Sequence, residues 1–401
     1  MSTGGGRWGA LALLAVVQIL GMSPWFAGTA LAPALTEAWG LSSAQVGWLS
    51  SAVQLGFVAG TLTAAVLNLA DVLPSRWYVA GAAALAALAN AMLGVAEGFS
   101  VAVASRFMTG FFLAGVYPPA MKMAATWFTS ARGLAIGVVV GALTIGKAMP
   151  YLVEALGGVG KGFVIWSTSG AAIAAALLVG AFYQDGPYPF ARRAFSWGLV
   201  GTVVREPRAR LVTGGYLGHM WELYAFWAWV PVFIAASMTA RTPDAPPSGV
   251  GVSLLTFGII AVGAIGCIWG GLAGDRWGRP RAVTVALGVS GTCCLLSGLV
   301  FGGSPWLLLP VMALWSIAVI ADSAQFSAMI TETVPSHAVG TALTLQVALG
   351  FLLTMASIQL VPVMAEIIGW RWGFAVLAFG PAAGIAAIRG LRSAAGSTPE
   401  T

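Results

Sequence analysis

Long apolar runs recur along the whole chain and constrain its fold more than any other feature. Runs of 18 or more mostly apolar residues are long enough for a helix to cross the hydrocarbon core of a bilayer. Only 8% of the 401 residues are charged, whereas soluble domains carry about a quarter. The sequence therefore predicts an all-α membrane protein. Its twelve predicted transmembrane helices cover approximately residues 8–34, 45–69, 77–97, 100–124, 133–156, 162–183, 210–236, 250–273, 282–302, 305–331, 338–364 and 371–391.

The distribution of basic residues predicts the orientation of these helices. If the first helix starts in the cytoplasm, 13 of the 19 Lys and Arg residues fall in cytoplasmic segments and three in segments on the other side. Short loops rich in Lys and Arg remain in the cytoplasm. We therefore expect both termini in the cytoplasm and the protein in a bacterial inner membrane. The first run is too long for a cleaved signal peptide, and eleven more runs follow it.

The longest polar connection divides the chain into two halves. It covers residues 184–209 and leaves residues 1–183 and 210–401 as two bundles of six predicted helices. The loops after the second and eighth runs resemble each other, and their aspartates, Asp71 and Asp275, stand 204 residues apart. Tandem six-helix halves with a binding site between them are a transporter architecture. The sequence thus predicts two pseudo-symmetric bundles around a central cavity.

Several motifs resemble those of the major facilitator superfamily. The segment Gly271-x-x-x-Asp275-Arg-x-Gly-Arg279-x-Arg281 resembles the loop signature of that family, and the segment from Leu67 to Arg76 resembles a degraded first copy. Arg106-Phe-Met-Thr-Gly110 resembles its Arg-x-x-x-Gly motif, and Gly137-x-x-x-Gly141 resembles its glycine-rich fifth helix. The resemblance covers essentially the whole chain. It implies the fold of that superfamily, secondary active transport by alternating access, and a monomer.

The charges in the two signature loops are candidates for a gate. An aspartate at a helix end and arginines across the loop can pair with the opposite half in one access state and release it in the other. The alternative is that these charges only set the topology. The candidate gating residues are Asp71, Arg76, Lys122, Asp275, Arg279 and Arg281.

Three basic residues fall within predicted helices, where a charge is costly and marks a functional site by default. Lys147 lies 15 residues beyond Arg132, roughly 22 Å along the helix at 1.5 Å per residue. It needs an anionic ligand or a carboxylate partner, unless it reaches the outer interface. Arg106 suits a bidentate grip on an oxyanion, or a structural hydrogen-bond hub. Lys122 follows Tyr117-Pro118-Pro119, which predicts a bend in the fourth helix.

Acidic residues and a histidine fall within the second half. Glu222 lies near the midplane of the seventh helix, and His219 shares its helix face at a spacing of three residues. Asp322 is a second buried acid, in the tenth helix. We predict Glu222, His219 and Asp322 as candidate proton-coupling groups. The alternative is a permanent ion pair, for example between Glu222 and Lys147.

Polar and aromatic side chains within other helices are candidates for completing the cavity. Met22-Ser-Pro24 predicts a kink in the first helix. Together with Lys147 and Arg106, the predicted substrate-binding residues are Trp25, Gln54, Tyr117, Trp227 and Gln346.

Two transport functions fit this set of residues. The first is transport of a small organic or inorganic anion, with optional coupling to protons, because the cations lie in one half and the acids in the other. The alternative is proton-driven efflux of drugs or lipophilic cations, in which the acids would contact the substrate. Transport of a metal or metallophore through Met220, His219, Met121 and Met123 is a remote third hypothesis, since the spacing does not form a metal cluster.

Other functional classes find little support. The sequence contains no nucleotide-binding loop and no catalytic constellation, so we do not predict an enzyme or a cofactor. The net charge of +6 is explained by the basic cytoplasmic loops rather than by nucleic-acid binding. The partners we expect are a small solute, protons and the lipid bilayer.

Overall fold

The computed structural model describes the chain except for residues 1–2, 130, 158–160, 189–194, 246 and 397–401, and every extended regular element in the described part is a helix. Part of the predicted connection 184–209 therefore lies outside the described residues. The helices of the first half are α1 (Thr3–Gly21), α2 (Ala27–Ala30), α3 (Ala32–Trp39), α4 (Ser43–Val66), α5 (Leu69–Val72), α6 (Ser75–Ala91), α7 (Phe99–Leu113), α8 (Tyr117–Ala125), α9 (Arg132–Gly157) and α10 (Lys161–Phe182).

The second half follows the short helix α11 (Val200–Arg205). Its helices are α12 (Pro207–Arg241), α13 (Gly249–Trp277), α14 (Arg279–Val300), α15 (Pro305–Ala321), α16 (Ser323–Thr333), α17 (Val339–Ile368), α18 (Trp370–Gly373) and α19 (Phe379–Gly396). Short 3₁₀ segments, such as Met92–Val95 after α6, extend several of them.

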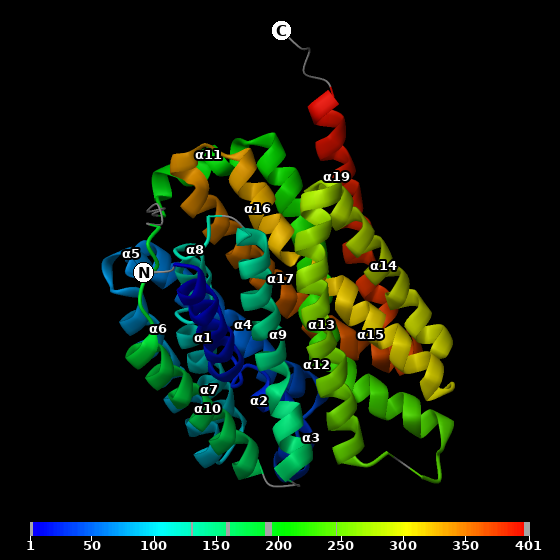
Figure 1. The fold of residues 1–401 in the computed structure, drawn as a ribbon. Coiled ribbons are helices and arrows are strands. Elements are labelled where there is room, and N and C mark those ends of the chain that lie inside the picture. Colours follow the sequence, from blue (N-terminus) through cyan, green and yellow to red (C-terminus); the bar gives the residue numbers. More distant parts are fainter. Residues whose placement is uncertain (1–2, 130, 158–160, 189–194, 246, 397–401) are drawn as a thin grey trace.

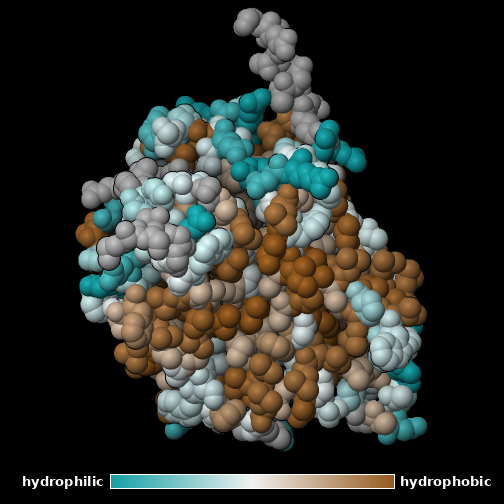
Figure 2. Space-filling model, viewed as in Figure 1, coloured by the Kyte–Doolittle hydropathy of each residue, from teal (hydrophilic) through white to brown (hydrophobic). Residues whose placement is uncertain are grey.

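The helices form a belt that suits a bilayer. Eleven helical segments of the described chain are long and apolar enough to cross a membrane, and the shorter apolar segment Gly6–Gly21 supplies the first of twelve. Figure 2 shows apolar residues across the middle of the molecule and hydrophilic residues gathered above them. Large apolar side chains such as Leu177 and Leu299 are exposed on helices α10 and α14. Apolar side chains exposed in this way are typical of a surface in contact with lipid, so they confirm the prediction of a multi-pass membrane protein.

The two halves meet along two pairs of helices. Helix α9 packs against α13, next to it at the centre of Figure 1, and α4 packs against α17. Gly137 of α9 permits the close approach, since a Cβ there would lie 3.2 Å from the carbonyl oxygen of Cys267. The interface runs far along both helices: Gly133 faces Asp275 near one end, and Ser253 donates a 2.8 Å hydrogen bond to Glu154 near the other.

Within the described residues, the first, fourth and tenth membrane-crossing helices each contain a break between two α-helical segments. The first breaks at residues 22–26, between α1 and α2, and the fourth breaks between α7 and α8, directly before Tyr117-Pro118-Pro119. Both interruptions confirm predictions made from prolines. The tenth breaks at Asp322, between α15 and α16, where the sequence has no proline. These breaks position several of the predicted site residues.

Candidate functional site

Lys147 lies at the centre of the interface between the halves. It is only 2% exposed, and its ammonium group lies 3.9 Å from the ring centroid of Trp25 and 4.5 Å from that of Tyr224. The Tyr224 hydroxyl is also its hydrogen-bond partner, and Trp227 lies 5.9 Å away. No carboxylate of the described residues forms an ion pair with Lys147. Aromatic faces attract a cation, by about 2 kcal/mol or more when it is desolvated, but they leave its net charge in place.

The rings around Lys147 belong to a larger aromatic cage, which we define as Trp25, Phe57, Tyr224, Trp227 and Phe351. Phe57 of α4 and Phe351 of α17 lie 4.6 Å apart between ring centroids, and Trp25 lies 5.2 Å from Phe57. Tyr224 lies 5.1 Å from Phe351 and 5.7 Å from Trp227. The cage therefore takes residues from both halves and closes over the ammonium group.

Arg106 lies apart from Lys147 and stabilises the break in the first helix. Its guanidinium donates 2.6 Å hydrogen bonds to the backbone oxygen of Pro24 and to Oδ1 of Asn90, and a longer one of 3.4 Å to the backbone oxygen of Trp25. Asn90 in turn donates to Thr168 and Ser169 of α10. A helix break leaves backbone carbonyl groups without their usual partners. Arg106 supplies donors for two of them and so fixes the backbone of Trp25.

Glu222 is enclosed within the second half. Its carboxylate accepts hydrogen bonds from Ser290 Oγ at 2.9 Å, from Cys294 Sγ at 3.3 Å and from the indole N–H of Trp315. The side chain is fully buried, and within the described chain it forms no ion pair. The alternative of a permanent pair between Glu222 and Lys147 is therefore wrong for this conformation.

His219 and Asp322 come together at the break in the tenth helix. Nδ1 of His219 lies 2.8 Å from Oδ1 of Asp322, which is close enough for an ion pair when the ring is protonated. Both side chains are buried, and neither ring nitrogen makes a well-aligned hydrogen bond to a described residue. The ring centroids of Tyr216 and Phe326 lie 5.8 and 5.9 Å from that of His219. Of the ion pairs among the described residues, this is the one in which both side chains are almost completely buried.

The first signature loop carries an ion pair within its own half. Lys122 of α8 binds the carboxylate of Asp71 and donates a 2.6 Å hydrogen bond to the backbone oxygen of Ala70. Arg76 lies over the ring of Trp77, 5.0 Å from its centroid. In this conformation Asp71 and Lys122 hold the loop between α4 and α6 against α8.

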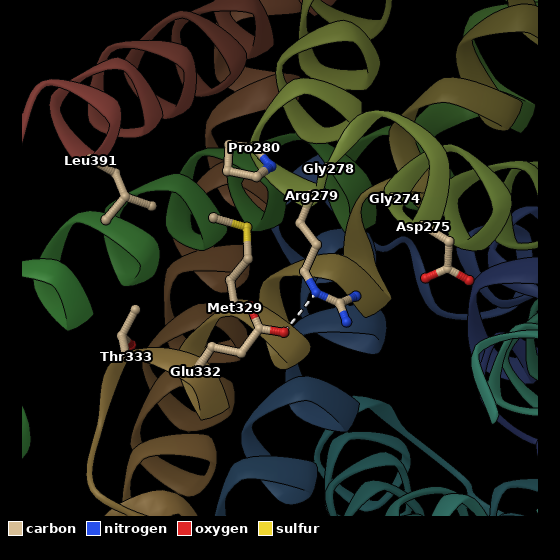
Figure 3. Close-up of a pocket in the computed structure, with 9 residues that line it drawn as sticks. All are labelled: Gly274, Asp275, Gly278, Arg279, Pro280, Met329, Glu332, Thr333 and Leu391. Atoms are coloured by element: carbon tan, nitrogen blue, oxygen red, sulfur yellow. Dashed lines mark hydrogen bonds and ion pairs between the residues drawn. The ribbon is translucent and has the colours of Figure 1, made fainter. Parts of the chain in front are cut away.

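The second signature loop borders a cavity of about 420 Å³. Arg279 donates a 2.9 Å hydrogen bond to Glu332 on α16 (Figure 3) and a second one of 2.9 Å to Gln325 on the same helix. Asp275 stands apart from this pair and lies against the other half, where a Cβ on Gly133 would be 3.5 Å from its Oδ2. Arg281 lies in the first turn of α14. Among these gating candidates, Asp275 contacts the opposite half at the start of α9.

Several predicted cavity residues have buried polar atoms without partners in the described structure. They are both side-chain amide atoms of Gln54 and Gln346 and the indole nitrogens of Trp25 and Trp227. Tyr117 is partly buried at the start of α8. Buried polar groups are usually hydrogen-bonded, so these atoms are available to a solute or to water.

Sequence reasoning missed three members of the aromatic cage. Phe57 and Tyr224 each lie three residues from a predicted site residue, Gln54 and Trp227, and so share its helix face. That spacing could have identified them. Phe351 carries no such signal, because only the packing of α17 on α4 brings it to the cage. Among the described residues, no three His, Cys, Asp or Glu side chains form a group that could hold a metal ion.

Comparisons with known proteins agree on the fold. The model of a family described as Major Facilitator Superfamily matches residues 12–357. A bacterial homologue of the human lysosomal transporter Spinster, solved inward-facing and unoccupied, has a TM-score of 0.67 at 15% identity, covering 97% of this chain and 95% of its own. The human organic anion transporter MFSD10 (TETRAN) has a TM-score of 0.73 at 17% identity, covering 95% of this chain and 99% of its own. No curated protein sequence matches the chain.

Proposed function

Because the chain belongs to the Major Facilitator Superfamily, whose members of similar structure are transporters, we propose that it moves a small organic anion across the membrane by alternating access. Lys147 supplies the anion site in this proposal. One solved neighbour is described as an organic anion transporter, but at this identity the likeness carries the fold alone, and the proposal rests on Lys147.

The observation that carries the proposal is a buried ammonium group between the two halves without a carboxylate among the described residues. A lone charge at this depth is costly, and an anionic ligand removes the cost. Lys147 belongs to the first half and its neighbours Tyr224 and Trp227 to the second. An anion bound there would touch both halves, as a solute must if its binding is to bias their rearrangement.

The His219–Asp322 pair is our candidate for proton coupling. The two groups are buried within 2.8 Å of each other, so gain or loss of one proton changes their interaction strongly. Glu222 has three hydrogen-bond donors from its own half, so we place it second. Under this proposal, Asp322 and His219 bind the proton that accompanies the anion.

The gate and the orientation complete the proposal. We place the protein in a bacterial inner membrane as a monomer, with α11 and the connection 184–209 on the cytoplasmic side between domains 1–183 and 210–401. Asp275, Arg279 and Arg281 would close that side together with Asp71, Arg76 and Lys122. The contact of Asp275 with the start of α9 supports this assignment.

Uptake by liposomes containing the purified protein tests the proposal. The solutes are labelled acetate, lactate and benzoate, with tetraphenylphosphonium as the lipophilic cation. We expect uptake of at least one carboxylate, a reduction of tenfold or more in Lys147→Met, and no change in Arg241→Met, a control at an exposed helix end. An inward proton gradient should stimulate uptake by the wild type but not by Asp322→Asn.

Transport of tetraphenylphosphonium without any carboxylate would contradict the anion assignment. It would favour the alternative of lipophilic-cation efflux, in which the aromatic cage alone holds the substrate. The position of Lys147 inside that cage argues against it, since a cationic substrate would meet the ammonium group at close range.

A further inference from the structure

The surroundings of Lys147 are far more apolar than a site for a small hydrated anion requires. Two aromatic faces lie within 4.5 Å of its ammonium group, and a third lies within 6 Å. Phe57 and Phe351 extend this surface away from the charge, because they contact Trp25 and Tyr224. The anion-binding group thus lies against three rings of the cage, and Phe57 and Phe351 lie beyond them.

We propose that the aromatic cage selects aryl carboxylates, that is, anions whose carboxylate is attached to a flat apolar ring. This inference rests on the anion transport proposed above. A ring of this kind can stack on the cage while its carboxylate binds Lys147. Aromatic pairs contribute about 0.5–1.5 kcal/mol each beyond the area that they bury. A small inorganic anion gains none of this contact.

The hydrogen-bond donors at the site match a carboxylate. Tyr224 brings its hydroxyl to the ammonium group, and the indole N–H groups of Trp25 and Trp227 are buried without a partner in the described structure. Indole nitrogen is a donor only, and an ionised carboxylate is an acceptor only. A cation with two free donors beside it is therefore complementary to a carboxylate, which has only acceptors and a negative charge, and not to a protonated amine.

Phe57 and Phe351 are the residues that determine selectivity in this proposal. Their ring centroids lie 4.6 Å apart, one in each half. Neither is among the rings that lie over the Lys147 ammonium group. Replacing Phe351 by leucine removes an aromatic face and leaves the charge and its donors in place.

A thermal-unfolding series on the purified full-length protein tests this selectivity. The ligands are benzoate, cyclohexanecarboxylate, acetate, nitrate and benzylamine, and a ligand that binds the native state raises the unfolding temperature according to its concentration relative to Kd. We expect benzoate to act at concentrations at least tenfold lower than cyclohexanecarboxylate, acetate or nitrate. Phe351→Leu should remove that advantage. Phe374→Leu, the same change in a ring pair with Phe233 within the second half, should keep it.

The outcomes separate the two proposals. Equal stabilisation by all the carboxylates and nitrate would overturn aromatic selection and leave anion transport standing. Stabilisation by benzylamine alone would overturn the anion site itself. No effect of benzoate up to its solubility limit, or an unchanged benzoate advantage in a folded Phe351→Leu protein, would also overturn the aryl carboxylate assignment.

Discussion

The buried ionisable side chains differ in the residues that surround them. Arg106 and Glu222 are provided with partners from their own half, whereas Lys147 meets aromatic rings from both halves. The sequence identified all three as charges within the membrane, because an ionisable residue in an apolar run is conspicuous. It could not assign their partners, since Asn90 and Ser290 are single polar residues on other helices.

Replacement of Arg106 by methionine tests its role as a clamp on the first helix. The change leaves the amide oxygen of Asn90 buried and unsatisfied, at a cost of about 1–3 kcal/mol. It also removes the shorter of two hydrogen bonds to the carbonyl oxygen of Pro24, which keeps the 3.2 Å bond from the backbone N–H of Ala27. We expect a lower unfolding temperature in detergent. In a double-mutant cycle Asn90→Leu should make the loss non-additive. An Arg106→Met protein as stable as the wild type would contradict this role.

The packing of whole helices against one another explains the Arg-x-x-x-Gly motif. Arg106 fixes the first helix, and Gly110, one turn later on α7, lets α4 approach until a Cβ would collide with the backbone oxygen of Val53. The sequence predicted the breaks at Pro24 and Pro118 because proline disrupts a helix. The break at Asp322 was not predicted, because it has no local signal and depends on how α15 and α16 pack.

Alanine at Gly110 should therefore destabilise the protein by about 1–3 kcal/mol, since overpacking forces the backbones apart. Gly81 of α6 is the control, because a Cβ there has open space. Alanine at Gly81 should be neutral or stabilising by up to about 1 kcal/mol, the difference in helix propensity. Unfolding temperatures of the two variants in the same detergent give the comparison. Equal changes in the unfolding temperature of the two variants would mean that helix propensity, and not the contact between α4 and α7, explains the glycine at position 110.

The two halves of the whole molecule were predictable, whereas the interface between them was not. Apolar runs and the spacing of Asp71 and Asp275 gave two bundles, because each run is a local property of the chain. Which side chains close the interface depends on the packing of α9 on α13 and of α4 on α17. The cage residue Phe351 was missed for this reason, whereas the spacing of Phe57 from Gln54 is a local signal.

Asp275 should help to hold the halves together at the start of α9. A carboxylate beside a helix N-terminus is favourable, typically by about 0.3–1 kcal/mol, and Asn would lose the charge. Cys267 lies buried on the same face of the interface, 3.9 Å from Thr144. We expect Asp275→Asn to raise the rate at which a maleimide labels Cys267 in a protein without the other cysteines, whereas Asp244→Asn in an exposed loop should not. An unchanged rate in Asp275→Asn would exclude Asp275 from the gate.

Binding of benzoate measured by titration calorimetry tests the central claim most directly. The wild type and Lys147→Met would be compared at one pH in the same detergent, since methionine is an unbranched side chain without charge. The account predicts that benzoate binds the wild type and that Kd rises at least tenfold in the variant, or about 1.4 kcal/mol. An unchanged Kd in a folded Lys147→Met protein would show that the anion binds elsewhere and that Lys147 is a structural cation held by its aromatic neighbours.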